Sequence, residues 1–142
     1  MALLMSGAAQ STAQPTLGSG GGLGSEPRFL PMEEAFRWSV SRDSDRQISV
    51  RWEIAPEYYL YREQFHFSLA GNEARLSAEL PDGVNHHDDY FGDVQVYYDS
   101  VRATLTLPDR HSGPLDLQIR FQGCAEAGLC YPPHRETVTV QP

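Results

Sequence analysis

Five segments of this chain alternate apolar and polar residues with a period of two, and this pattern constrains the fold more than any other feature. The segments are residues 48–54, 65–69, 101–107, 115–121 and 138–140. Because the side chains of a β-strand point alternately to opposite faces, each segment predicts a strand with one apolar and one wet face. Each apolar face needs a second sheet to cover it. The sequence therefore predicts an all-β fold built as an antiparallel β-sandwich.

The N-terminal part of the chain differs from this pattern. Residues 1–26 are small and polar and end in a run of glycine and serine, which is typical of a flexible leader, a linker or a tag remnant. Residues 27–142 have the size of one domain. Near its start, a proline followed by two glutamates predicts a short helical turn within residues 30–36.

The charged residues narrow the classes of partner. The formal net charge is −8, and arginine supplies all eleven basic residues. Because this excess of negative charge repels phosphates, we expect no nucleic-acid partner. No stretch approaches eighteen apolar residues, so we expect no membrane-spanning segment. The first residues also lack the basic region and the long apolar region of an intact signal peptide.

The two cysteines, Cys124 and Cys130, lie close together near the C-terminus. We expect Cys124 to end the strand of residues 115–121, and a pair at a strand edge can be exposed to a partner. A disulfide between them would close a very small ring, and such a ring restrains the unfolded chain less than a long one. This favours a reversible dithiol–disulfide couple, in which one sulfur attacks a partner and the second resolves the mixed disulfide. An ordinary structural bridge in a secreted domain is the alternative. Two thiols without a Cys-x-x-Cys pair disfavour a zinc site.

Residues 86–92 combine histidines, acids and aromatics between two strand segments, and we interpret them as a loop. A metal site would use His86 and His87, but adjacent side chains on an extended chain point to opposite sides, so we expect no metal here. A solvated loop is one interpretation. A flap is another, in which aromatic side chains lie over a reactive group and nearby carboxylates raise the pKa of a thiol.

Four segments together resemble a known family, the N-terminal periplasmic domains of the bacterial thiol:disulfide interchange protein DsbD. The most specific is residues 122–133, which hold both cysteines, and residues 29–36, 58–62 and 88–92 follow the family's order. The resemblance extends from Phe29 to about Val140. It implies an immunoglobulin-like β-sandwich that carries a redox-active cysteine pair and needs no cofactor.

The resemblance also implies partners and a location. The domain would receive electrons from a C-terminal thioredoxin-like domain of the same full-length protein. It would pass them to periplasmic disulfide isomerases of the DsbC type and to the thioredoxin-like protein of cytochrome c maturation. The full-length family members are anchored in the bacterial inner membrane, so we expect this chain to be one periplasmic domain of a longer protein. A non-catalytic immunoglobulin-like binding module with a structural disulfide is the alternative.

Residue roles follow from the same resemblance. Cys130 corresponds to the cysteine that forms mixed disulfides with partners, and Cys124 to the one that resolves them. A cap loop shields the pair and consists of Asp88, Asp89, Tyr90, Phe91 and Gly92. Tyr90 stands where the family usually has a phenylalanine as the shielding residue. Tyr59 and Tyr61 correspond to tyrosines that line the site.

Overall fold

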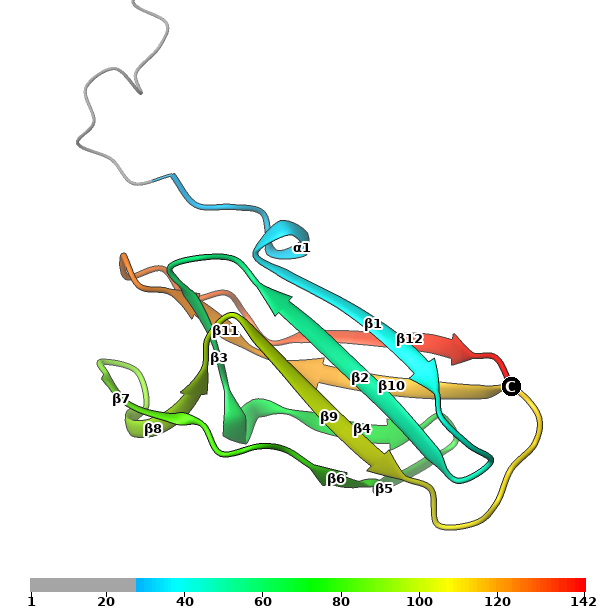
Figure 1. The fold of residues 1–142 in the computed structure, drawn as a ribbon. Coiled ribbons are helices and arrows are strands. Elements are labelled where there is room, and N and C mark those ends of the chain that lie inside the picture. Colours follow the sequence, from blue (N-terminus) through cyan, green and yellow to red (C-terminus); the bar gives the residue numbers. More distant parts are fainter. Residues whose placement is uncertain (1–27) are drawn as a thin grey trace, which may run out of the picture.

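The computed structural model describes residues 28–142, without the side chains of residues 72 and 73, and it is an antiparallel β-sandwich (Figure 1). The linker predicted for residues 1–26 lies outside the described residues. The predicted helical turn is present as α1, Met32–Ala35, with Glu33 and Glu34 in its first turn. It leads directly into the first strand. No helix of the described part is long and apolar enough to cross a membrane.

The first sheet has the strand order β1-β2-β9-β6. Its strands are β1 (Phe36–Arg42), β2 (Gln47–Ile54), β6 (Ser77–Glu79) and β9 (Ser100–Thr106). The alternation predicted for residues 48–54 is confirmed at Ile48, Val50 and Trp52, which are completely buried, and at Arg51 and Glu53, which are exposed. Ser49 departs from it, because it is buried and donates a hydrogen bond to Asp43.

The second sheet has the order β12-β10-β4-β5 and covers the apolar face of the first. Its strands are β4 (His66–Leu69), β5 (Asn72–Arg75), β10 (Leu115–Phe121) and β12 (His134–Val140). The core between the sheets centres on Trp52, whose ring lies 4.7 Å from that of Phe65 and 5.5 Å from that of Phe121. The predicted sandwich, in which each sheet buries the apolar face of the other, is confirmed.

A third, small sheet forms one end of the molecule, away from the C-terminus (Figure 1). Its order is β11-β3-β8-β7, with β3 (Tyr58–Tyr61), β7 (Val84–Asp88), β8 (Gly92–Tyr97) and β11 (Gly123–Ala125). A single 3₁₀ turn, Arg62–Gln64, joins β3 to β4 of the second sheet. One residue, Gln122, joins β10 to β11, and its carbonyl accepts the amide of Tyr61 at 3.0 Å. The end sheet is therefore a continuation of the second sheet.

Two sequence-based expectations about this end were wrong in part. Residues 86–92 are not one loop, since β7 runs to Asp88 and β8 begins at Gly92, which leaves a short hairpin turn. The expected loop arose because β7 is a mostly exposed strand without apolar alternation. Cys124 does not end the strand of residues 115–121 but lies in the separate strand β11, paired with β3.

Candidate functional site

The two cysteines form a disulfide across a tight antiparallel hairpin at the end sheet. Their Cα atoms are 4.0 Å apart. Two backbone hydrogen bonds flank the pair: Ala125 N to Leu129 O at 2.7 Å and Tyr131 N to Gly123 O at 3.0 Å. Cys124 and Cys130 are thus a non-hydrogen-bonded pair, the position where facing Cα atoms lie closest and both side chains leave on one face. The local hairpin therefore brings the sulfurs together without help from distant parts of the chain.

The two cysteines differ in accessibility. Cys124 is completely buried, whereas Cys130 is partly exposed. Cys124 belongs to a small buried cluster with Tyr59, Tyr61 and Val96, and this cluster is separate from the main core. The expectation that a pair at a strand edge is open to a partner therefore holds for Cys130 alone.

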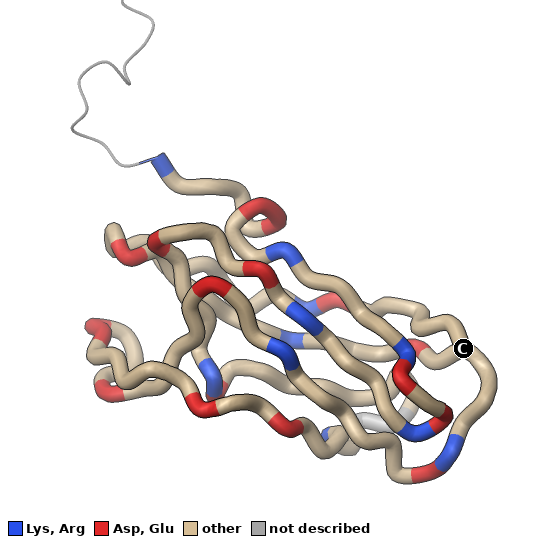
Figure 2. Tube along the Cα trace, in the orientation of Figure 1, with Lys and Arg blue, Asp and Glu red and all other residues tan. Residues whose placement is uncertain are grey.

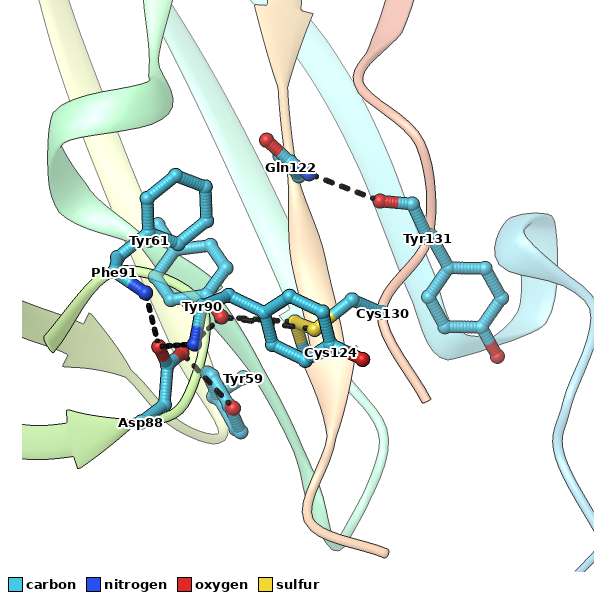
Figure 3. The surroundings of a disulfide bond; sticks show 9 residues. All are labelled: Tyr59, Tyr61, Asp88, Tyr90, Phe91, Gln122, Cys124, Cys130 and Tyr131. Carbon is cyan, nitrogen blue, oxygen red and sulfur yellow. Dashed lines mark hydrogen bonds between the residues drawn. A yellow bond between two sulfur atoms is a disulfide. The ribbon is translucent and has the colours of Figure 1, made fainter. Parts of the chain in front are cut away.

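Strand β3 supplies the tyrosines that line the disulfide. Tyr59 and Tyr61 are two residues apart, so they share a face of the strand, while Tyr58 points to the main core. The Tyr61 hydroxyl lies 2.9 Å from Sγ of Cys124 and 3.7 Å from Sγ of Cys130 (Figure 3). Tyr61 is therefore in contact with both sulfurs.

The carboxylate of Asp88 connects β3 to the hairpin turn between β7 and β8. Its Oδ2 accepts a hydrogen bond from the Tyr61 hydroxyl and a longer one, 3.4 Å, from the Tyr59 hydroxyl. Its Oδ1 accepts the backbone amides of Tyr90, at 3.0 Å, and Phe91, at 2.7 Å (Figure 3). One buried side chain thus closes the turn and fixes it over the tyrosines.

Burial and hydrogen bonding set the protonation of this group. Burial would raise the pKa of Asp88, but the donors Tyr61, Phe91 N and Tyr90 N outweigh it, and the pKa is lowered. Burial and the hydrogen bond to Asp88 raise the pKa of Tyr61, which stays protonated. Because the Tyr61 proton is donated to Asp88, the Tyr61 oxygen can only accept a hydrogen bond from Cys124, which carries an S–H proton only after reduction of the disulfide. After reduction, this contact favours Cys124 as a thiol over a thiolate.

The turn after Asp88 places two aromatic side chains near the disulfide. The ring of Phe91 packs edge-on against that of Tyr61, with 4.7 Å between centroids. Tyr90 is 64% exposed, and its ring overlaps the disulfide in the view of Figure 3. Gly92 has a positive φ of 74°, which closes the turn at little cost. Asp89 is exposed and makes no hydrogen bond or ion pair with any residue in the described part of the chain.

A second polar contact joins the hairpin to the cysteine ring, and sequence reasoning missed it. Tyr98 donates a hydrogen bond to Glu126, which lies inside the ring, and its hydroxyl is 3.4 Å from Nδ1 of His86. The His86 ring lies 4.6 Å from that of Tyr59. Tyr98 follows a core residue, Tyr97, so strand alternation could have placed it on the site's face.

The side chains of His86 and His87 in β7 contact different neighbours, as expected for adjacent residues of a strand. His87 is exposed and pairs with Asp93 at 2.8 Å, and this hydrogen bond raises the pKa of His87. His86 instead faces Tyr59. Within residues 28–142, no three His, Cys, Asp or Glu side chains gather in an arrangement that could hold a metal ion.

A glycine lets the cysteine strand approach β3 closely. A Cβ on Gly123 would lie 2.5 Å from both Cζ of Phe36 and the carbonyl oxygen of Tyr59. Real Cβ atoms essentially never come so close, so any side chain here would push β11 away from the sheet. Gly123 thereby sets the position of Cys124.

The fold and the site define an immunoglobulin-like β-sandwich domain with a half-buried disulfide at one end. A profile of the family described as "Thiol:disulfide interchange protein DsbD, N-terminal" matches residues 26–142. The chain belongs to this family of DsbD N-terminal domains, as its sequence motifs indicated. Thiol–disulfide interchange is accordingly the activity class of the family.

Relatives and solved structures agree with this assignment. DsbD 2 of Pseudomonas aeruginosa is 45% identical over 112 residues, which cover 79% of this chain and 18% of the relative. DsbD of Yersinia pestis is 36% identical over 140 residues, 97% of this chain and 23% of the relative. The chain thus spans about a fifth of the length of these curated relatives.

Two solved structures from Neisseria meningitidis share the fold. The reduced DsbD N-terminal domain has a TM-score of 0.73 at 27% identity and covers 80% of this chain and 90% of its own. The complex of the DsbD and PilB N-terminal domains has a TM-score of 0.68 at 27% identity, covering 80% and 88%. The immunoglobulin-like fold expected from the resemblance is confirmed.

Proposed function

We propose that this domain is a protein-disulfide reductase module that carries two electrons on Cys124 and Cys130. The observation that carries the proposal is the unequal burial of the pair, with Cys124 enclosed and Cys130 partly exposed. A partner can approach only one sulfur, so the pair has a defined order of reaction. Cys130 exchanges with the partner, and Cys124 resolves the mixed disulfide.

The exchange balances as two successive displacements. The Cys130 thiolate attacks one sulfur of the partner disulfide, forms a mixed disulfide and releases the other partner sulfur as a thiol after protonation. The Cys124 sulfur then attacks Sγ of Cys130, which closes the ring and releases the second partner thiol. The partner gains two electrons, and the pair is oxidised. The proton of Cys124 leaves along its contact with the Tyr61 oxygen, which is backed by the ionised Asp88.

The direction and partners of this transfer are also proposals. Electrons arrive from a C-terminal thioredoxin-like domain of the full-length protein, which reduces the ring by the reverse steps. They leave to DsbC-type disulfide isomerases and to the thioredoxin-like protein of cytochrome c maturation, in the periplasm. The much greater length of the relatives supports a multidomain protein. The Neisseria complex supports docking of another domain on such a fold.

The hairpin turn of residues 88–92 is proposed to be the cap of this site. Tyr90 is the shielding side chain, Phe91 anchors the turn on Tyr61, and Asp88 holds it closed. Acidic positions gather at this end of the molecule, around β7, β8 and β11 (Figure 2). Because carboxylates near a thiol disfavour the thiolate, the resting pair reacts slowly with small oxidants, and a docking partner must displace the cap.

The test compares single cysteine variants in electron transfer to a DsbC-type isomerase. Cys130→Ser should abolish transfer with the fold intact, since Cys124 remains buried. Cys124→Ser should accumulate a mixed disulfide, because the resolving sulfur is missing. If Cys130→Ser reduced the isomerase at the wild-type rate, the proposal would be wrong. An inert wild-type pair would instead favour a binding module with a structural bridge.

A further inference from the structure

The outer face of the second sheet, on the side away from the core, carries three arginines and a histidine in a row. Arg120 on β10 lies directly opposite His66 on β4 and Arg135 on β12. One step along the sheet, Arg75 on β5 lies opposite Ser68 on β4. Neighbouring strands are about 4.8 Å apart, so these four side chains stand side by side across four strands.

These charges have no anionic partner in the described structure. Within residues 28–142, and leaving aside the side chains at 72 and 73, neither Arg75, Arg120 nor Arg135 makes an ion pair or a side-chain hydrogen bond. Glu136 is the carboxylate residue nearest to this row on β12, and it pairs instead with His134 at 3.0 Å. Like charges directly opposite each other in a sheet destabilise it, so this row has a cost that an anion would remove.

Two polar atoms in the row are buried without a partner. Nε of Arg120 and Nδ1 of His66 have no hydrogen-bond acceptor or donor among the described residues. Leaving such atoms unpaired costs about 1–3 kcal/mol each, and native proteins rarely keep them without a reason. Burial, and then Arg75, Arg120 and Arg135, lower the pKa of His66. A bound anion would therefore give these unpaired nitrogens an acceptor and offset the charge of the three arginines.

The surface is hollowed at this place. A depression of about 490 Å³ is lined by the three arginines and His66, together with Ser68, Gln118, Thr137 and the carboxylate residue Glu136. Its floor is the polar outer face of β4 and β10, so its lining offers hydrogen-bond donors and hydroxyls. Such a hollow suits a small polar anion better than an apolar ligand.

We propose that this hollow binds a phosphate group, held by Arg120 and Arg135 with Arg75 and His66 beside them. A planar guanidinium group can donate two parallel hydrogen bonds to a phosphate, so an arginine cluster suits this ligand. The net charge of −8 repels anions at long range, so binding here depends on the local cluster. The site lies outside the redox centre and does not rest on the proposed function.

The test follows the His66 imidazole by NMR while sodium phosphate is added at pH 7.5 and constant ionic strength. A saturable shift of the His66 signals is expected, together with a rise of the His66 pKa, because a bound anion stabilises the imidazolium. Arg120→Gln and Arg135→Gln should each weaken the affinity at least about tenfold, the loss of one charge-assisted hydrogen bond. Sodium chloride in place of phosphate should give no saturable shift.

The first sheet offers a matched control. Arg51 and Arg102 also face each other directly across two strands on an outer face, but no histidine lies in their row. Arg51→Gln should leave the phosphate affinity unchanged. Equal weakening by Arg51→Gln and Arg120→Gln, or equal shifts with chloride, would show unspecific charge attraction and overturn the proposal. Thiol exchange should be unaffected in all three variants.

A phosphate group can come from a soluble molecule or from a lipid headgroup. Phosphatidylcholine vesicles with and without phosphatidylglycerol separate these sources. Vesicle binding that needs the anionic lipid, is displaced by inorganic phosphate and is lost in Arg120→Gln assigns the site to a lipid headgroup. Phosphate binding without vesicle binding assigns it to a soluble phosphate. Vesicle binding that phosphate does not displace, or binding of neither ligand, contradicts the site.

Discussion

The carboxylate of Asp88 receives two tyrosine hydroxyls from β3 and two backbone amides from the turn that follows it. These donors replace the water that burial removes, so a nearly buried carboxylate can remain ionised. The same bonds hold Tyr61 against the sulfur of Cys124. The redox environment of the pair and the closure of the turn therefore depend on one side chain.

The lowered pKa of Asp88 predicts how stability depends on pH. Its contribution to the free energy of unfolding is complete above the ordinary carboxyl pKa of about 4 and is lost as the pH falls through the lowered folded value. Asp88→Asn should therefore lower the free energy of unfolding by about 1–2 kcal/mol at pH 7. The difference from wild type should disappear in strong acid, as measured by urea unfolding between pH 2 and pH 7.

Asp89 provides the control for this prediction, because it is adjacent and exposed and forms no hydrogen bond with the described residues. Asp89→Asn should leave both the stability at pH 7 and its pH dependence unchanged. Asp89→Asn could instead reduce the acid dependence of the free energy of unfolding as much as Asp88→Asn does. General charge repulsion would then account for the effect, and the special role of Asp88 would be excluded.

At the residue scale, the motif resemblance named Tyr59, Tyr61 and Asp88, and the structure brings all three together. Strand alternation alone explains why Tyr59 and Tyr61 share a face. The sequence could not predict that Asp88 would bond to them, because β7 and β3 are not neighbours but are separated by β8. It equally gave no sign of the contact between Tyr98 and Glu126. Contacts of this kind depend on how separate elements pack.

Among the elements, the hairpin β7–β8 is attached to the rest of the end sheet along a short edge. Strands β3 and β8 pair only at Leu60 with Tyr97 and at Tyr61 with Val96. The turn therefore extends beyond the paired part of β8, and Asp88 and Phe91 provide its contacts with β3. A hairpin held in this way can open at its tip without loss of the sandwich.

Shortening the aromatic side chains of the tip should expose the disulfide. Tyr90→Ala is expected to speed reduction of the pair by a small thiol about threefold or more, because the side chain proposed to shield the sulfurs is gone. Phe91→Ala should act in the same direction by releasing the turn from Tyr61. Stopped-flow measurement of dithiothreitol reduction checks both.

Val84, at the other end of β7, is also exposed and serves as the comparison. Dithiothreitol should reduce the disulfide of the Val84→Ala variant at the wild-type rate. Identical rates for Tyr90→Ala and wild type would mean that Tyr90 does not shield the pair, and the assignment of the cap would then rest on Phe91 alone.

The sequence predicted the strands that bury one face but not the exposed or very short ones, and the reason is physical. Strands that bury one face carry a period-two pattern, and β2, β9 and β10 were found from it. Strand β1 also alternates, at Phe36, Trp38 and Val40, but its first residue was assigned to the helical turn. Strand β7 carries almost no buried side chain, so no apolar pattern marks it. Strand β11 is too short for a period.

On the scale of the whole molecule, the disulfide joins no distant parts. The bridged residues are six apart and already face each other in a hairpin. The main core around Trp52 is separate from the cluster that holds Cys124. We therefore expect the sandwich to fold in both redox states of the pair.

This predicts similar stability for the oxidised and reduced protein. The loop-entropy relation gives about 2 kcal/mol for so short a ring, against about 4.7 kcal/mol for a ring of 100 residues. We expect the oxidised form to be more stable by no more than about 2 kcal/mol, measured by denaturant unfolding with and without reductant. A double cysteine-to-serine variant should behave like the reduced protein. Loss of the fold on reduction would instead identify the bridge as a structural staple.

The join between the end sheet and the sandwich also bears on how such domains diverge. The chain passes between the second sheet and the end sheet through residues 62–65, through Gln122 and through residues 126–133. Substitutions at the hairpin tip, residues 89–91, therefore leave the main core of the sandwich untouched, whereas the cysteine ring contributes Ala125 to that core. We therefore expect that exchanging a few residues at the tip can alter which partner docks there, while the sandwich keeps its own packing.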